Sequence, residues 1–249
     1  TYPNSAAKSS KIEQCYLTTT AGKYVATAKA DQVQCLKNNY CAGGTKVHYG
    51  STGGMQSCAT GYESAAGASS CTTTTYTITY NLNSGTNAAG AKTSYTIETA
   101  DYTLPTPTKT GYTFGGWYEN SGLTGTAVTK IAKGSTGNKT FWAKWTVKSV
   151  TCAAGKYLPA NSLSCGDCGA GYACPGGTFE YKNTDQGISQ CSGYTKYSAS
   201  GASSCSTVSA GYYTTGCAGN DKCTGQSQCT DATYCSGGIK YDCPTAYTA

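Results

Sequence analysis

The residues best suited to chemistry in this 249-residue sequence are 16 cysteines and one histidine, His48. Thiols form disulfides in an oxidising compartment, and closely paired thiols bind zinc. The one Cys-x2-Cys pair, Cys165 and Cys168, lies far from His48. His48 near Cys41 or Cys58 could form a catalytic pair on paper, but a surface histidine in a stapled loop fits the pattern better. We therefore expect disulfides, with no metal site, no cofactor and no enzyme activity.

Composition and charge restrict the partners further. The net charge is +6, but all 18 basic residues are lysines, and they are scattered along the chain. Because nucleic-acid readers rely on arginine forks, we expect no nucleic-acid partner. No apolar run is long enough to cross a bilayer. The chain begins at Thr1 without a signal peptide or an initiator methionine, so we expect any export signal or anchor to lie outside it.

The cysteines form a repeat when the sequence is aligned with itself. Cys35, Cys41, Cys58 and Cys71 are separated by 5, 16 and 12 residues, and Cys168, Cys174, Cys191 and Cys205 by 5, 16 and 13 residues. The words Ala-Gly-Lys-Tyr and Gly-Ala-Ser-Ser-Cys recur in register with them. A third unit begins near Ala210 and carries Cys229 and Cys235. Agreement of spacing and words indicates true repeats.

Two cysteines of the middle unit, Cys152 and Cys165, are absent from both sister units. Their positions hold Thr19 and Gln32 in the first unit, and Val208 and Gln226 in the third. Because losing one partner alone would leave a free thiol, this joint loss predicts that Cys152 pairs with Cys165. The third unit carries an insertion with Cys217 and Cys223, which we expect to form a local pair.

These units resemble the cysteine-rich modules of tumour-necrosis-factor-receptor and ephrin-receptor-like type. The words Gly-Ala-Ser-Ser-Cys and Cys-x2-Cys-x-Ala-Gly-Tyr carry the resemblance, over about two thirds of the chain. It implies a crossed pairing, with Cys168–Cys191 and Cys174–Cys205 in one unit and Cys35–Cys58 and Cys41–Cys71 in another. A nested scheme, Cys168–Cys174 with Cys191–Cys205, stays open, because spacing alone does not decide connectivity. Either scheme predicts elongated stapled modules, since such units bury too little apolar surface to fold unaided.

The long cysteine-free stretch between the repeats reads as β-structure. Apolar and polar residues alternate from Tyr76 to Leu82 and again from Phe141 to Trp145, with the period of a half-buried strand. We expect the core of this domain to contain Tyr112, Phe114, Trp117, Phe141 and Trp145.

The same stretch is similar to the Listeria–Bacteroides repeat, also called the internalin B-repeat or Flg_new family. Leu104-Pro105, the word Gly-Tyr-Thr-Phe-Gly-Gly-Trp-Tyr at 111–118 and Trp-Ala-Lys-Trp at 142–145 carry this similarity, over about 70 residues. It implies a small β-grasp-like domain on bacterial surface and secreted proteins, acting as a spacer or adhesion module without a catalytic motif.

The predicted organisation is therefore mostly β, with a β-grasp-like domain inserted between cysteine-rich modules. The expected segments are 1–72 (with the end of a preceding unit at 1–15), 73–148, 149–206 and 207–249. We expect an extracellular structural or adhesive protein, as a stalk segment or a filament subunit. The alternative is a receptor-like module that binds a protein or glycan on another cell. Asn138, in Asn-Lys-Thr, is the one N-glycosylation acceptor.

The ends of the chain carry incomplete units. Cys15 stands where a final cysteine is expected, and the terminal unit has three cysteines, Cys229, Cys235 and Cys243. One of these three lacks an in-register partner, either Cys235 in the crossed scheme or Cys243 in the nested one. We expect the repeat to continue past both ends, or copies of the chain to join head to tail.

Overall fold

The structure, a computed structural model, describes residues 4–5, 15–28, 31–219 and 221–244. Its described residues form strands and turns with no helix, so the predicted mostly-β fold class is confirmed. The chain divides into two compact units. The first contains residues 1–83, 87–106 and 116–144, and the second contains residues 84–86, 107–115 and 145–249.

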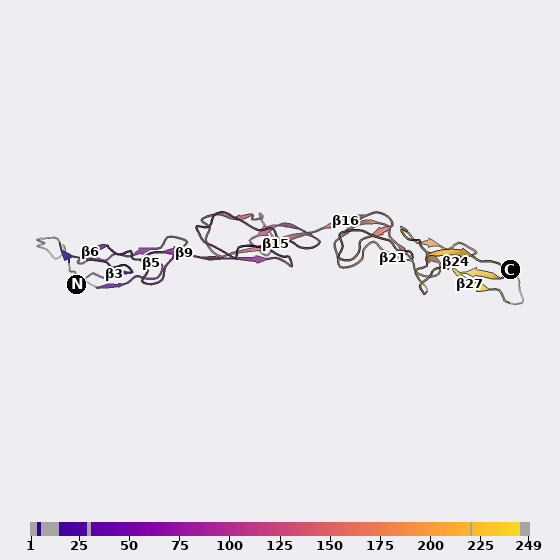
Figure 1. Cartoon of the computed structure of the whole chain (residues 1–249), viewed down its shortest axis with the longest axis horizontal. Helices are drawn as coiled ribbons and strands as arrows, with labels where there is room; N and C mark the ends of the chain where they lie inside the picture. Colours follow the sequence, from indigo (N-terminus) through magenta and orange to yellow (C-terminus); the bar gives the residue numbers. More distant parts are fainter. Residues whose placement is uncertain (1–3, 6–14, 29–30, 220, 245–249) are drawn as a thin grey trace. The chain divides into compact units, whose positions relative to one another are not determined.

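Short antiparallel hairpins build the cysteine-rich parts of both units (Figure 1). The first unit has three among its described residues: β3 (Lys23–Val25) with β4 (Gln32–Gln34), β5 (Asn39–Tyr40) with β7 (Gln56–Ser57), and β8 (Tyr62–Glu63) with β9 (Thr72–Thr73). The described second unit has five: β17 (Lys156–Tyr157) with β18 (Gly166–Asp167), β19 (Tyr172–Ala173) with β21 (Ser189–Gln190), β22 (Lys196–Tyr197) with β23 (Ser206–Thr207), β24 (Tyr212–Thr215) with β25 (Gly225–Gln228), and β26 (Thr233–Ser236) with β27 (Ile239–Asp242).

One backbone hydrogen bond closes each of these hairpins. We call the residue directly before the first strand the turn residue, and the residue directly after the second strand the closing residue. The closing N–H donates to the turn carbonyl over 2.8–3.0 Å in the pairs Cys35–Gly22, Cys58–Asn38, Thr74–Gly61, Cys168–Gly155, Cys191–Gly171, Val208–Thr195, Cys229–Gly211 and Cys243–Ala232. Glycine suits the turn residue because the chain turns there through a left-handed conformation, with φ of 80° at Gly22 and 82° at Gly155.

The interior of the array is thin, and one buried position recurs along it, three residues after each turn residue. We call this the inner position. It is buried in seven of the eight hairpins, in the residues Val25, Cys41, Ser64, Leu158, Cys174, Ser198 and Thr214. Cys235 of the last hairpin is half-buried. A core this thin cannot offset the loss of chain entropy by burial alone, so the hairpins need further links.

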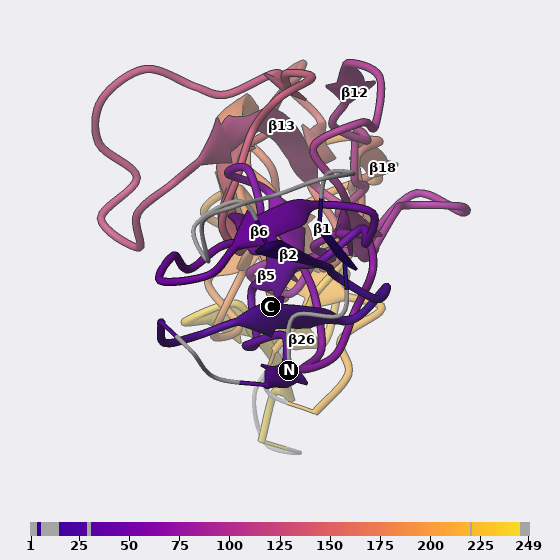
Figure 2. The ribbon, with the colours of Figure 1, turned by 90° about the vertical axis from the view of Figure 1, so that its left-hand side faces the viewer.

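Two additional pairings frame the repeats. In the first unit, β2 (Cys15–Thr18) lies between β1 (Asn4–Ser5) and β6 (Lys46–His48), as Figure 2 shows from the end of the molecule. In the second unit, β16 (Ser149–Cys152) pairs with β20 (Gly177–Glu180). In both cases a strand just before the first hairpin of a repeat, β2 or β16, pairs with the strand that follows the repeat's first short disulfide loop, β6 or β20.

The central segment forms a four-stranded mixed sheet in the order β11 (Ser94–Tyr95), β10 (Tyr76–Asn81), β15 (Lys139–Val147) and β13 (Tyr112–Tyr118). Strands β10 and β15 run parallel, and β12 (Tyr102–Thr103) pairs separately with β14 (Lys130–Ile131). Trp117 and Phe141 are 2% and 1% exposed. The Tyr80 ring lies 5.2 Å from that of Trp117, whose Nε1 donates to the Pro105 carbonyl over 2.7 Å.

The other three predicted core residues, Tyr112, Phe114 and Trp145, are half-buried and belong to the second unit. The rings of Phe114 and Trp145 meet edge to face at 5.5 Å, and the Lys109 ammonium lies 4.4 Å from the Tyr112 ring centroid. Nearby, the Lys148 N–H donates to the Gly111 carbonyl over 2.9 Å. The chain leaving the central segment therefore repeats the closing bond of the cysteine-rich hairpins.

Candidate functional site: the links between hairpins

Six of the seven disulfides among the described residues follow two rules. Each begins at an anchor position, three or four residues before a turn residue. A short link joins the anchor to the inner position, as in Cys35–Cys41, Cys168–Cys174 and Cys229–Cys235, with Cα atoms 6.0–6.1 Å apart. A long link joins the anchor to the return position, three residues before the closing residue, as in Cys58–Cys71, Cys152–Cys165 and Cys191–Cys205, with Cα atoms 5.7–5.8 Å apart. These separations suit unstrained cystines.

Where a long link has no cysteines, a glutamine takes its place. Gln32 and Gln226 occupy the return positions of hairpins β3/β4 and β24/β25. The Gln226 Oε1 accepts from the Ser209 N–H over 2.8 Å, and the Gln32 Oε1 accepts from the Thr20 N–H over 2.5 Å. In both hairpins the donor directly follows the anchor position. This glutamine clasp therefore ties the same two chain segments that Cys152–Cys165 joins covalently.

The crossed disulfide scheme is wrong in this structure, and the nested scheme is present. The left-handed turn at Asn38, with φ of 61°, brings Cys41 back to Cys35. The antiparallel pairing of β8 with β9 brings Cys71 back to Cys58. The crossed partners Cys35 and Cys58 are instead closing residues of successive hairpins, each already bonded locally. The same geometry replaces Cys168–Cys191 and Cys174–Cys205 with Cys168–Cys174 and Cys191–Cys205.

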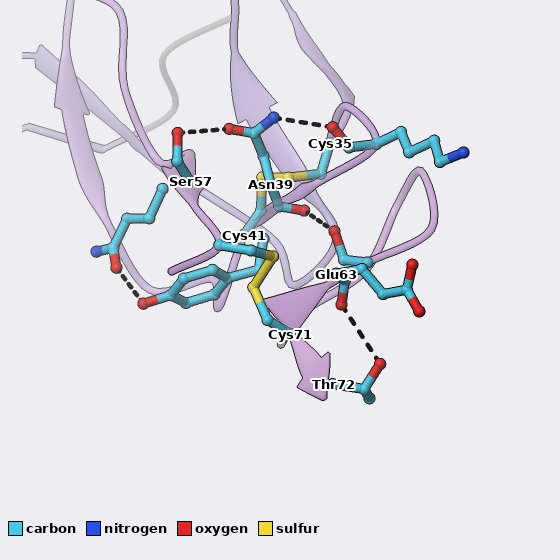
Figure 3. The surroundings of a disulfide bond; sticks show 12 residues. Cys35, Asn39, Cys41, Ser57, Glu63, Cys71 and Thr72 are labelled. Carbon is cyan, nitrogen blue, oxygen red and sulfur yellow. Dashed lines mark hydrogen bonds between the residues drawn. A yellow bond between two sulfur atoms is a disulfide. The ribbon is translucent and has the colours of Figure 1, made fainter. Parts of the chain in front are cut away.

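Buried hydroxyls connect successive hairpins beside these links. The Ser64 Oγ donates to the Asn39 carbonyl over 2.6 Å, and the Ser198 Oγ donates to the Tyr172 carbonyl over 2.7 Å. Each serine occupies an inner position, and each acceptor is the first strand residue of the preceding hairpin. Figure 3 shows the surroundings of Asn39, whose side chain also accepts a hydrogen bond from the Ser57 hydroxyl. Because a buried hydroxyl needs a partner, the bond fixes how neighbouring hairpins stack.

The remaining cysteines fall at the loop of one hairpin and at the two ends. Cys217 and Cys223 are bonded to each other within the β24–β25 connection. Cys15 and Cys243 are the free thiols among the described residues, and both are half-buried. Of the two alternatives for the terminal unit, the nested one is present: Cys229 and Cys235 form a short link, and Cys243 is the cysteine left without an in-register partner.

The other residues that the sequence singles out, His48 and Asn138, are not part of the disulfides or the glutamine clasps. His48 is exposed, and its ring lies 5.9 Å from that of Tyr16. Within the described ranges no group of three or more His, Cys, Asp or Glu side chains is placed to hold a metal ion. The structure also describes no helix that is long and apolar enough to span a membrane. Asn138 is exposed, and its Oδ1 accepts from the Thr77 N–H over 2.9 Å.

Electrostatic contacts are sparse. In the first unit, the Tyr62 hydroxyl donates to the Glu98 carboxylate over 2.8 Å, and this bond raises the pKa of Tyr62. The contact ties hairpin β8/β9 to the central segment, where Ile97 also lies against Gly61. The Lys130 ammonium, 2.6 Å from Asp101, and the Lys133 N–H lower the pKa of that carboxyl group. The Lys130 and Asp101 side chains are 54% and 52% exposed, so this ion pair contributes little to stability.

Comparison with known families identifies one part of the chain. Residues 76–144 match the Listeria-Bacteroides repeat domain. The matched stretch contains most of the mixed sheet and the buried residues Trp117 and Phe141, and the flanking cysteine-rich hairpins are not identified by family. No curated protein is significantly similar to the chain. A repeat domain of this family together with seven disulfides fits an extracellular structural or adhesive module.

Sequence reasoning missed the size of the structural repeat. Each cysteine-rich unit was treated as one module, whereas the structure resolves it into hairpins with alternating long and short links. The signal was present in the recurring words Gly-Lys-Tyr, Thr-Gly-Tyr and Ala-Gly-Tyr, which mark the turn residue and first strand of successive hairpins. The clasp at Gln32 and Gln226 could also have been noticed, since both glutamines replace the same cysteine.

Proposed function

We propose that the chain is a non-enzymatic structural segment of an extracellular surface protein, in which linked hairpins act as a load-bearing spacer around a Listeria-Bacteroides repeat domain. The observation that carries the proposal is the pattern of links. Within each unit, hydrogen bonds and disulfides join each hairpin to its neighbour along the chain. Arrays of this kind gain stability additively from each repeat and its nearest-neighbour contacts.

The short span of each disulfide supports a mechanical role. The links close loops with sequence separations of 6 to 14 residues, so stretching the chain releases little length before a covalent bond bears the load. The state of the cysteines supports the same mechanical role, because 14 of the 16 cysteines form disulfides. Such bonds persist outside the reducing interior of a cell.

We extend the proposal to partners of the same kind. Cys243 is a closing residue, like Cys58 and Cys191, which each anchor a long link to the following hairpin. Cys15 lies opposite Ser5 in the β1–β2 register, as the return residue Gln32 lies opposite the inner residue Val25. Cys243 and Cys15 therefore match the anchor and return positions of a long link, and this match supports the proposal.

Such a link would join Cys243 to the return cysteine of a further hairpin, in the same polypeptide or in a second copy through Cys15. The two thiols would lose two protons and two electrons to an oxidised dithiol-exchange protein of the extracellular compartment. This head-to-tail contact need not close on itself and so builds a continuing array.

The test is intact mass and non-reducing electrophoresis of the oxidised chain. We expect a ladder of disulfide-linked oligomers that collapses to the 25.6 kDa monomer in Cys15→Ser and in Cys243→Ser. The double variant Cys217→Ser, Cys223→Ser removes a local bond, should keep the ladder and serves as the matched control. A wild-type chain that stays monomeric because Cys15 and Cys243 bond to each other internally would overturn the end-to-end proposal.

A further inference from the structure

One face of the central sheet carries an aromatic side chain that the core does not use. Trp142 lies in the middle of β15 between the buried residues Phe141 and Ala143, so its side chain points to the opposite face. It is half-buried there and lies next to Asn81 in the parallel register with β10. A partly open indole offers a flat apolar surface on which a ligand ring can stack.

A hollow of about 370 Å³ opens beside this ring within the first unit. Its lining consists of Glu119, Asn138, Lys139, Thr140 and Trp142. The volume lies in the lower part of the range for small-ligand sites. The lining therefore combines one aromatic ring with four different polar side chains.

The polar groups are held in place and nearly neutral as a set. The Asn138 amide is fixed by its bond from the Thr77 N–H, which leaves the Nδ2 group as its donor toward a ligand. The Lys139 ammonium lies 3.7 Å from the Glu119 carboxylate, so the two charges offset each other. The Lys144 ammonium lies 5.3 Å from the Tyr118 ring centroid and is not part of the hollow's lining.

We propose that this hollow binds a neutral pyranose saccharide, with one sugar ring stacked on Trp142. The C–H face of a pyranose is apolar and suits an indole, while its hydroxyls both donate and accept. Glu119 supplies acceptors, Lys139 and the Asn138 amide supply donors, and Thr140 supplies both. The offset charges disfavour an anionic ligand, because neither sign dominates the site. Saccharide binding adds an adhesive activity to the structural role and uses residues separate from the terminal cysteines.

The test is saturation-transfer NMR and tryptophan fluorescence on the full chain, with lactose, cellotriose and chitotriose as probes and a heparin oligosaccharide as the charged comparison. We expect saturable binding of at least one neutral probe, a change in tryptophan emission, and little dependence on salt. Trp142→Thr, which keeps a good strand former, should weaken binding at least tenfold. Glu119→Gln should weaken it severalfold while leaving the fold intact. Lys144→Ala, on the same face outside the hollow, should change affinity less than twofold.

Three results would overturn the proposal. One is the absence of saturable binding to all three neutral probes. Another is unchanged affinity in both Trp142→Thr and Glu119→Gln. The third is binding confined to heparin and abolished by salt, which would indicate a lysine surface instead. The oligomer ladder of the preceding test is read independently, so either proposal can fail alone.

Discussion

Replacing the Cys152–Cys165 disulfide with a glutamine clasp should recover part of its stabilising effect. The double substitution Cys152→Val, Cys165→Gln copies the residues Val208 and Gln226 of hairpin β24/β25. Cys152 is 3% exposed, so valine fills a comparable buried space. The isosteric control is Cys152→Val, Cys165→Met, which keeps the length of the side chain and removes its amide.

The expected loss in the free energy of unfolding follows from the length of the loop that the disulfide closes. The disulfide closes a loop with a sequence separation of 13 residues, which corresponds to about 3 kcal/mol in the chain-entropy model. One regained hydrogen bond, from the Ala153 N–H to the glutamine Oε1, contributes about 1 kcal/mol. The glutamine variant should therefore lose about 2 kcal/mol and the methionine variant about 3 kcal/mol.

Hydrogen exchange at the Cys168 amide measures this directly, because that N–H closes hairpin β17/β18 by donating to the Gly155 carbonyl over 3.0 Å. A loss of 3 kcal/mol is roughly a hundredfold fall in protection, and the glutamine variant should be protected about fivefold better than the methionine variant. Equal exchange rates in the two variants would show that the clasp does not substitute for the bond.

Four further outcomes are expected. Trypsin cuts after Lys182, so a non-reduced digest should release the peptide set joined by Cys152–Cys165 separately from the set joined by Cys191–Cys205; one combined species would restore the crossed pairing. Trp117→Ala should destabilise the central sheet by roughly 3–5 kcal/mol in denaturant titration, because its ring is 2% exposed, and a cost under about 1 kcal/mol would contradict a core role. Burial and, next in importance, the Tyr102 hydroxyl raise the pKa of Tyr80. The stabilising contribution of the neutral Tyr80 phenol is complete below the ordinary phenol pKa of about 10 and is lost as the pH rises above it. Tyr80→Phe should therefore flatten the dependence of the central sheet's stability on alkaline pH. The segment 73–148 expressed alone should melt cooperatively and independently of reductant, and a molten product would place the domain limits elsewhere.

The central sheet was accessible from the sequence because its signals are local. Alternation along Tyr76–Asn81 and in Phe141-Trp142-Ala143 fixes which side chains face inward, and Trp117 and Phe141 are buried as expected. The half-burial of Phe114 and Trp145 was not accessible. Gly115-Gly116, with φ of 110° at Gly116, bends β13, so residues before and after the bend belong to different clusters.

The disulfide connectivity shows where spacing stops being informative. Joint absence of Cys152 and Cys165 from sister units predicts a bond that the structure contains, because covariation of two positions reports their contact. The crossed scheme had no such support and rested on resemblance alone. The left-handed turn at Asn38 brings Cys41 back to Cys35, and an asparagine gives no strong sign of such a turn in the sequence.

The alternation of cystine and glutamine at one position explains how the array holds together. With only a few buried side chains per hairpin, no hairpin has a core that could define its own stacking. An interaction from the anchor position is therefore needed in each of them, and the chain supplies it as a short link, a long link or a clasp. The disulfide and the glutamine clasp are interchangeable in geometry because they start from adjacent residues. The disulfide begins at the anchor position, three or four residues before the turn residue, and the clasp begins at the residue after the anchor. A return-position glutamine is thus a mark of the same hairpin in a cysteine-poor sequence, and it predicts the register of the strands on either side of it.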